Sequence, residues 1–272
     1  MKNVIVVFIL LFIVSSCQKE DFDIINLNSN KISVLGHGGM GIGHTYPMNS
    51  FESIFNCLSL GADGTELDVQ MTKDSILVAF HDELLENSTN ISGRIFNATW
   101  AEIKNATFTD PPYTNYKLIT LNELFSNIAN QTEYTFFLDC KNFNPDTSSL
   151  YLNTFNNALI KIIDEHNLEN SVYIEFKRKD LIKSLKTKRP DLKIFVYSDF
   201  DLALDIVTEF QLQGITVSVD NISKDEVIKA HNNGTMIAVF NTHSKNKNIE
   251  AIEKNVDFIQ SDKVKHLIKT LK

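Results

Sequence analysis

Short runs of β-branched and aromatic residues alternate along this chain with longer stretches in which apolar residues recur every three to four positions. The short runs predict buried strands, and the longer stretches predict amphipathic helices. We expect strands at 32–36, 64–70, 134–141, 171–176, 193–198, 214–219, 235–240 and 256–260. We expect helices at 49–60, 121–129, 148–166, 179–187, 200–210, 223–232, 246–254 and 262–271.

This order of elements indicates an α/β fold. Eight strands, each followed by a helix, between residues 31 and 272 are the pattern of a (β/α)8 TIM barrel. A doubly wound open sheet has a similar alternation of elements and is the main alternative at this point.

One connection, from about residue 76 to 118, breaks the alternation. It contains the turn-rich stretches "ENSTNISGR" and "FTDPPYTN". Structureless connections of this length are uncommon and are usually functional. We therefore predict an insertion after strand two. Residues 75–82, "SILVAFHD", should form an extra strand that brings His81 over the mouth of the barrel.

The N-terminus has the features of an export signal. Residues 4–14 are an unbroken run of eleven apolar residues, too short for comfortable membrane spanning and typical of a signal-peptide core. The following Val14 to Cys17 resembles a bacterial lipobox; an ordinary signal peptide with an incidental cysteine is the alternative. We predict a lipoprotein signal peptide at 1–16, a lipid on Cys17, a lipid-anchored linker at 17–30 and a folded domain at 31–272. The protein would then be anchored in the bacterial cell envelope, as a periplasmic or outer-membrane surface protein.

Composition and charge narrow the partners. The chain has 272 residues with 43% hydrophobic residues, and its formal net charge is −8, so overall charge gives no support for nucleic-acid binding. A small anionic substrate would need local positive charge. Apart from Cys17, the cysteines are Cys57 and Cys140, which we expect to be buried free thiols. The sequence does not set the oligomeric state.

Acidic residues gather where barrel chemistry takes place, at the C-terminal ends of strands. Glu66 and Asp68 lie two residues apart on a strand and therefore share a face, and the same spacing pairs Asp139 with Lys141. Three converging carboxylates would repel one another. A bound Ca²⁺ or Mg²⁺ would remove that cost, because both ions prefer oxygen ligands.

Two histidines come to the same mouth. His37 follows strand one, and His81 ends the extra strand. A pair of histidines can supply a general acid and a general base. Together with a cation and Lys141 beside it, they indicate phosphodiester chemistry.

These segments also resemble a known family. The stretches "LGHGG" and "YPMNSFESI", the block from 60 to 95, and the later "LITLNELF", "FFLDCK" and "NVDFIQSD" are similar to motifs of the glycerophosphodiester phosphodiesterases. The resemblance implies a TIM-barrel catalytic domain over 31–272. It implies His37 and His81 as the acid–base pair, Glu66, Asp68 and Asp139 as metal ligands, Lys141 as a phosphate contact, and Asn49 as a residue lining the site.

The chain departs from the family pattern at four of these places. The family has Arg at Gly38, Glu at Met48, Glu at Asp139 and often Trp at Phe240. We hypothesise that the family's Arg at position 38 and Glu at position 48 support each other. Losing both then leaves no unpaired charge. Gly38 and Phe240 would still border the substrate. His44 could replace the missing Arg, or it could be an ordinary loop histidine.

The expected function is a metal-dependent phosphodiesterase for a small phosphodiester substrate. It would hydrolyse glycerophosphodiesters to glycerol phosphate and an alcohol, or act on related lipid or wall phosphodiesters. Alternatives are a phospholipase D-like lyase that forms a cyclic phosphate, a barrel that only binds, or one that cleaves another bond such as a sugar linkage.

Overall fold

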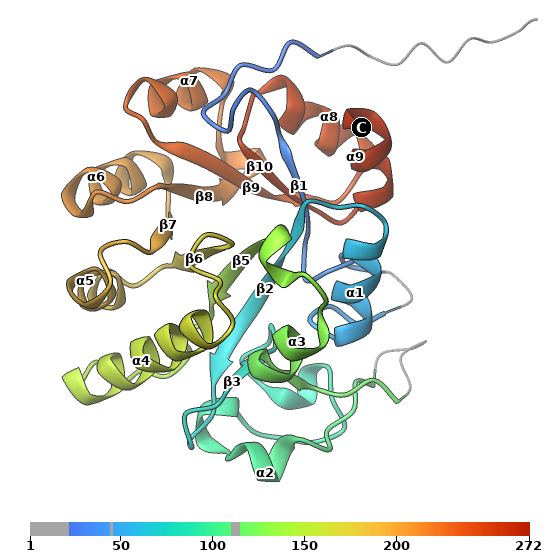
Figure 1. The fold of residues 1–272 in the computed structure, drawn as a ribbon, viewed down its shortest axis with the longest axis vertical. Helices are drawn as coiled ribbons and strands as arrows, with labels where there is room; N and C mark the ends of the chain where they lie inside the picture. Colours follow the sequence, from blue (N-terminus) through green and yellow to red (C-terminus); the bar gives the residue numbers. More distant parts are fainter. Residues whose placement is uncertain (1–21, 44–45, 110–114) are drawn as a thin grey trace, which may run out of the picture.

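Eight parallel strands close into a barrel in the computed structural model, which describes residues 22–43, 46–109 and 115–272 (Figure 1). The first strand pairs with both the second and the last, which closes the sheet and confirms the TIM barrel over the open alternative. The barrel strands are β1 (Ser33–Gly36), β2 (Gly64–Met71), β5 (Thr135–Cys140), β6 (Val172–Phe176), β7 (Lys193–Tyr197), β8 (Gly214–Ser218), β9 (Met236–Thr242) and β10 (Phe258–Ser261).

Helices surround the barrel, and the predicted positions are confirmed to within about two residues at either end. Local side chains explain where they begin. Ser50 caps the first helix, and Thr120 forms a capping box with Glu123. The helices are α1 (Phe51–Ser59), α3 (Leu121–Asn127), α4 (Ser149–Glu165), α5 (Lys179–Lys188), α6 (Phe200–Phe210), α7 (Lys224–Asn232), α8 (Lys245–Glu253) and α9 (Val264–Leu271).

The barrel interior is filled by aromatic side chains below its mouth. Phe137, Phe195 and Phe258 are almost fully buried and pack on one another. Phe137 and Asp139 lie two residues apart on β5 and therefore share its inner face. Strand geometry thus places an apolar floor directly beneath the acidic mouth.

The predicted insertion after strand two is a small subdomain. Its strand β3 (Leu77–Ala79) runs antiparallel to β2 and to β4 (Ile119–Thr120), which confirms the extra strand in a shorter form. The insertion also contains α2 (Trp100–Ile103) and the 3₁₀ turns η1 (Leu85–Asn87) and η2 (Ile95–Asn97). These elements enclose a core of their own, which consists of Val78, Phe80, Leu85, Ile95, Ile103, Ala106, Phe108 and Leu118.

Part of the predicted linker packs against the barrel. Residues 25–28 donate hydrogen bonds to Asn255, Val256 and Asp257, just before β10. Cys57 and Cys140 are buried free thiols, as predicted. No helix in the described residues is long and apolar enough to span a bilayer. The predicted signal peptide and Cys17 lie outside the described residues.

Candidate active site

Three buried carboxylates meet at the C-terminal end of the barrel. Glu66 and Asp68 come from β2, and Asp139 lies opposite Asp68 in the register of β5. One oxygen from each side chain lies within 4.8 Å of the others. All three residues are less than one tenth exposed. Such a set of carboxylate oxygens fits a hard divalent cation such as Ca²⁺ or Mg²⁺.

The loop after β1 orients two of these acids. The backbone N–H of Gly38 donates to Glu66 Oε2 at 2.9 Å. Asn49 Nδ2 donates to Asp68 Oδ2 at 2.6 Å, and the N–H of Asp68 donates back to Asn49 Oδ1 at 2.9 Å. Asn49 is 1% exposed and adopts φ +65°, a conformation that asparagine tolerates well. The direct contact made by Asn49 is therefore with a predicted metal ligand.

Lys141 neutralises part of this negative charge. Its Nζ lies 2.5 Å from Asp139 Oδ2 and 3.0 Å from Asp68 Oδ1. Burial alone would lower the pKa of Lys141, but the charges of Asp68 and Asp139 outweigh it and hold the pKa above its usual range. Lys141 is thus a permanent cation at the edge of the acidic cluster.

The acids titrate unequally because their surroundings differ. Burial, and then the charges of Asp68 and Asp139, raise the pKa of Glu66 well above its usual value. Burial also raises the pKa of Asp139. Burial opposes ionisation of Asp68 as well, but Lys141 and the hydrogen bond from Asn49 lower its pKa. A divalent cation would favour the ionised form of all three acids.

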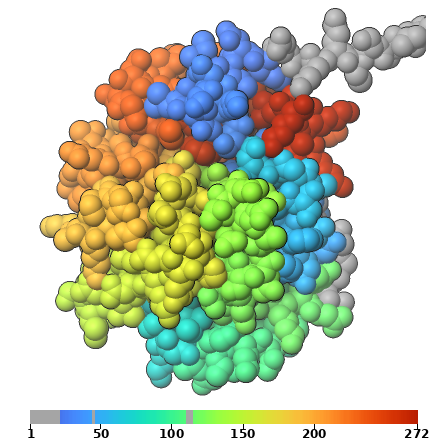
Figure 2. All heavy atoms as spheres, in the orientation of Figure 1, coloured from blue at the N-terminus to red at the C-terminus, as the bar shows by residue number. Residues whose placement is uncertain are grey.

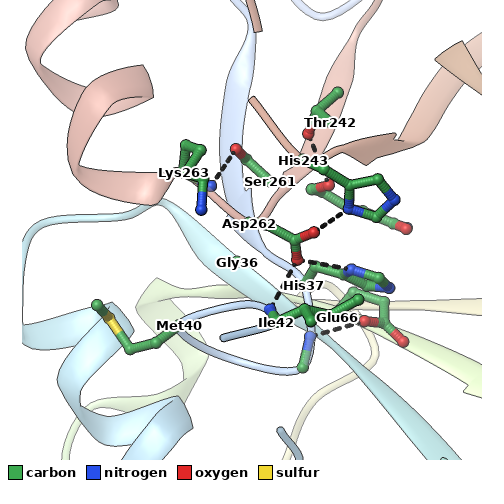
Figure 3. A network of polar contacts seen from close by, with 12 residues as sticks. Gly36, His37, Met40, Ile42, Glu66, Thr242, His243, Ser261, Asp262 and Lys263 are labelled. Carbon is green, nitrogen blue, oxygen red and sulfur yellow. Dashed lines mark hydrogen bonds and ion pairs between the residues drawn. The ribbon is translucent and has the colours of Figure 1, made fainter. Parts of the chain in front are cut away.

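His37 lies at this mouth and is held by an aspartate that directly follows the last strand (Figure 3). Its Nδ1 is 3.0 Å from Asp262 Oδ1, which also accepts the N–H of Ile42, while His243 Nδ1 contacts Asp262 Oδ2. Burial acts to raise the pKa of Asp262, but the hydrogen bonds from His37, His243 and Ile42 lower it to about 2. A carboxylate on Nδ1 fixes the orientation of the His37 ring and directs Nε2 to other partners.

His81 reaches the mouth from the insertion. Its Nδ1 lies 2.9 Å from Asp82 Oδ1, and Ser88 donates to the other oxygen of Asp82. The hydrogen bond that His81 makes to Asp82 raises the pKa of His81. His37 and His81 line one cavity of about 330 Å³ together with Glu66, Asp139 and Lys141. Every predicted acid–base residue and two of the three predicted ligands therefore border the same space.

Sequence reasoning missed a fourth acid. Glu175 of β6 pairs in register with Asp139 and also lines the cavity. Gln260 Nε2 donates to Glu175 Oε1 at 2.8 Å, and the Thr216 hydroxyl donates to the same oxygen. Burial and Asp139 raise the pKa of Glu175 to about 8.

A repeated pattern could have revealed this acid. Asp139 and Lys141 are followed one strand later by Glu175 and Lys177 with the same spacing. Lys177 lies beside the cavity with its Nζ 4.0 Å from the centre of the Tyr197 ring. The pair Asp262 and His243 was missed as well, although Asp262 stands in the "NVDFIQSD" segment.

The structure gives a physical reason for one departure from the family pattern. Gly38 has φ +56°, and a Cβ atom there would lie 2.8–2.9 Å from the side chain of Met48. Met48 therefore packs against the Gly38 backbone and occupies the space into which a larger side chain would project. Phe240 lines the cavity and packs edge-on against Tyr197. His44 lies outside the described residues.

Comparisons with known proteins agree with this architecture. The model of the glycerophosphoryl diester phosphodiesterase family matches residues 40–266. A glycerophosphodiester phosphodiesterase of Caldanaerobacter subterraneus is 30% identical over 167 residues, which are 60% of this chain and 65% of that protein. One from Bacillus altitudinis is 32% identical over 38% of this chain and 43% of its own length. The chain thus matches less than two thirds of the length of these relatives.

A solved structure shows the same fold. An Oleispira antarctica phosphodiesterase, determined in complex with the product sn-glycerol-3-phosphate, superposes with a TM-score of 0.78. The match covers 90% of this chain and 98% of that protein, at 17% sequence identity. At this level of identity, the likeness establishes the shared barrel.

Proposed function

Because this chain belongs to the glycerophosphodiester phosphodiesterase family, we propose that it is a phosphoric diester hydrolase that cleaves glycerophosphodiesters to glycerol phosphate and an alcohol. One observation carries the proposal. Three buried carboxylates, a lysine in contact with two of them and two carboxylate-held histidines meet at the mouth of the barrel. Such a site can bind a phosphate, neutralise its charge and move protons on either side of it.

The acidic cluster and Lys141 would hold the phosphate group. Glu66, Asp68 and Asp139 would hold a divalent cation, Ca²⁺ or Mg²⁺, which as a Lewis acid would stabilise negative charge on a phosphate oxygen. Lys141 stays charged and would stabilise the same developing charge from the β5 side. Asn49 would keep Asp68 oriented through its two hydrogen bonds.

The two histidines would transfer the protons. One would accept a proton from the attacking hydroxyl, either water or a neighbouring glycerol hydroxyl, and the other would donate a proton to the leaving alkoxide. The raised pKa of His81 favours its protonated form and therefore the role of general acid. His37, whose ring is held by Asp262, would then be the base.

The first test uses the chain without its predicted signal peptide, residues 18–272, with glycerophosphocholine. We expect hydrolysis that requires Ca²⁺, Mg²⁺ or Mn²⁺, stops with chelator, and falls by roughly 10²–10³-fold in Glu66→Gln, as when a key electrostatic group is removed. Calorimetry should show weaker cation binding by this variant. Glu253→Gln, on an exposed position of α8, is the matched control and should behave as wild type.

Two outcomes would change the proposal. Activity that survives both the chelator and Glu66→Gln would refute cation-dependent catalysis at this cluster. A cyclic phosphate among the released products, detected by phosphorus NMR, would show attack by an internal hydroxyl of the substrate in place of hydrolysis.

We also propose that the protein is anchored in the cell envelope through a lipid on Cys17. The support is the apolar run at 4–14 followed by the lipobox-like Val14 to Cys17. In a bacterial host, mass spectrometry of the membrane fraction should find the mature N-terminus as a lipidated cysteine. Cys17→Ser should abolish the lipidation, whereas an unmodified Cys17 in the wild type would refute the anchor.

A further inference from the structure

A second cavity adjoins the candidate active site on the side of the insertion. Its volume is about 390 Å³, within the range of small-molecule sites. His37, Ile42 and His81 line both this cavity and the acidic one. The two spaces therefore meet at the histidines. A single substrate could therefore place its phosphate in the first cavity and extend one of its alcohol groups into the second.

Part of the second cavity's wall on the insertion side is apolar and packed. Phe80 and Phe108 form part of it, with ring centres 6.3 Å apart, and both belong to the core of the insertion. Asp82 is the one carboxylate among the described lining residues, and it is already bonded to His81 and Ser88. Phe80 and Phe108 therefore form a preformed apolar surface beside the hydrogen-bonded Asp82 and Ser88.

A second apolar part of the lining comes from the loop after β1, where two of the departures from the family pattern lie. Met48 lines the cavity and packs against the backbone of Gly38. The family motifs carry a basic and an acidic side chain at these two positions. Here a thioether and a missing side chain replace them, and Pro47 extends the same surface. These two apolar surfaces favour a ligand group without charge or hydrogen-bonding atoms.

We propose that this second cavity is a subsite for an apolar group carried by one of the two alcohols of the phosphodiester substrate, an acyl or alkyl chain in particular. The proposal rests on the proposed function, because it assumes that the acidic cavity binds the phosphate. The driving force is removal of methylene groups from water. The glycerol alcohol or the other alcohol can carry the chain, and the experiment distinguishes the two.

The test is a chain-length series in two arms, kept below micelle-forming concentrations. In one arm, glycerophosphodiesters carry methyl, butyl, hexyl or octyl as the second alcohol. In the other, glycerophosphocholine carries an acetyl, butanoyl or hexanoyl group on its glycerol. We expect kcat/KM to rise by up to about fourfold for each methylene that enters the cavity, in one arm. The arm that shows the rise identifies the alcohol that faces the insertion.

Variants of Met48 locate the effect. Met48→Glu places a charge in the lining of the second cavity, so the rise in kcat/KM for each added methylene should fall below about 1.5-fold. Met48→Leu keeps an apolar side chain of similar volume and should keep the rise. Thermal unfolding of each variant checks that it is folded. A binding measurement on the wild-type protein needs no variant: hexyl phosphate should bind at least tenfold more tightly than methyl phosphate in calorimetry.

The outcomes separate this subsite from the proposed function. If glycerophosphocholine is hydrolysed but neither arm shows a rise, the subsite is wrong and the function stands. If no phosphodiester is hydrolysed, the proposed function fails, and the binding measurement alone decides on the cavity. Equal affinities for hexyl and methyl phosphate would then overturn the subsite, and so would an unchanged rise in Met48→Glu.

Discussion

At the scale of single residues, Asp262 controls the orientation of His37. Its two oxygens contact His37 and His243, and it accepts the N–H of Ile42 as well. Asp262→Asn exchanges one carboxylate oxygen for a donor group, so one imidazole must rotate or change its tautomer. We expect kcat to fall by about 10–100-fold with a smaller effect on KM, as when the carboxylate partner of a functional histidine is removed.

The chain contains a matched control for this variant. Asp257 is also buried and contacts a histidine, His231, at 2.9 Å, but at the opposite end of the barrel. Asp257→Asn should lower thermal stability and leave kcat unchanged. Steady-state kinetics on both variants make the comparison. Equal losses of kcat would show that the effect of Asp262→Asn is general destabilisation.

Glu175 should make the cation-free protein less stable as the pH rises. Because its pKa is raised from 4.5 to about 8, the folded state holds a proton that the unfolded state has released. Stability is therefore lost as the pH rises from about 4.5 to about 8. Glu175→Gln cannot ionise and keeps an oxygen for Thr216 and Gln260. It should be more stable than wild type by roughly 2–4 kcal/mol at pH 8 and nearly equal at pH 5.

Urea unfolding at the two pH values, in buffer with chelator, measures this difference. Adding a divalent cation should shrink it, because the positive charge favours ionised Glu175. The exposed Glu253→Gln should show no pH-dependent gain. A constant difference between Glu175→Gln and wild type from pH 5 to pH 8 would mean that Glu175 is ionised throughout this range.

At the scale of elements, the shared face of two acids on one strand was predictable, while contacts between distant loops were not. The spacing rule placed Glu66 and Asp68 on one face without any knowledge of the fold, and the barrel confirms it. The same rule applied to β6 would have found Glu175. By contrast, Asp262 meets His37 across 225 positions of sequence, which a local pattern cannot encode.

The role of Asn49 and the fit of Met48 escaped prediction for a related reason. Both depend on how the loop after β1 folds back over the strand ends. A motif shows that such residues stand at a special place. The direction of each side chain follows only from the packed structure. The helix and strand positions were predictable because apolar periodicity reports directly which face is buried.

The insertion is the element whose stability is easiest to test separately. Ile95 is fully buried in its core, and Trp100, the one tryptophan of the chain, lies beside that core. Ile95→Ala should destabilise the protein by about 2–5 kcal/mol, because it leaves a cavity. The Trp100 fluorescence transition should then move to lower urea. Ile76→Ala, at a side chain that is 37% exposed, should cost less than about 1 kcal/mol.

Comparison with far-UV circular dichroism shows how far the effect reaches. If both signals move together, the insertion unfolds with the barrel, as expected from the ladder between β2 and β3. If only the fluorescence moves, the insertion opens first. An unchanged Trp100 transition in Ile95→Ala would contradict the independent core described for the insertion.

At the scale of the whole molecule, the segment before β1 packs near the end of the barrel opposite the site. Figure 2 shows this N-terminal segment, in blue, packed against the orange and red C-terminal part of the chain. Asp257, which precedes β10, accepts the N–H groups of Leu27 and Asn28 on one oxygen and that of Ile237 on the other. The segment therefore ties the first strand of the barrel to the last two.

Removing this segment should loosen the barrel without touching its chemistry. A chain that begins at residue 31 loses the hydrogen bonds of 25–28 and the packing of Phe22 and Ile24 on the main core. At about 1 kcal/mol for each of several net hydrogen bonds, the loss should lower Tm by roughly 5–10 °C.

A chain that begins at residue 22 keeps these contacts, so its Tm should equal that of residues 18–272. Both should keep kcat near 25 °C, because the acids and histidines lie at the other end of the strands. Equal Tm values would mean that 22–30 is a tether with no structural role. A lower kcat in the shorter chain would mean that packing of this segment also shapes the catalytic mouth.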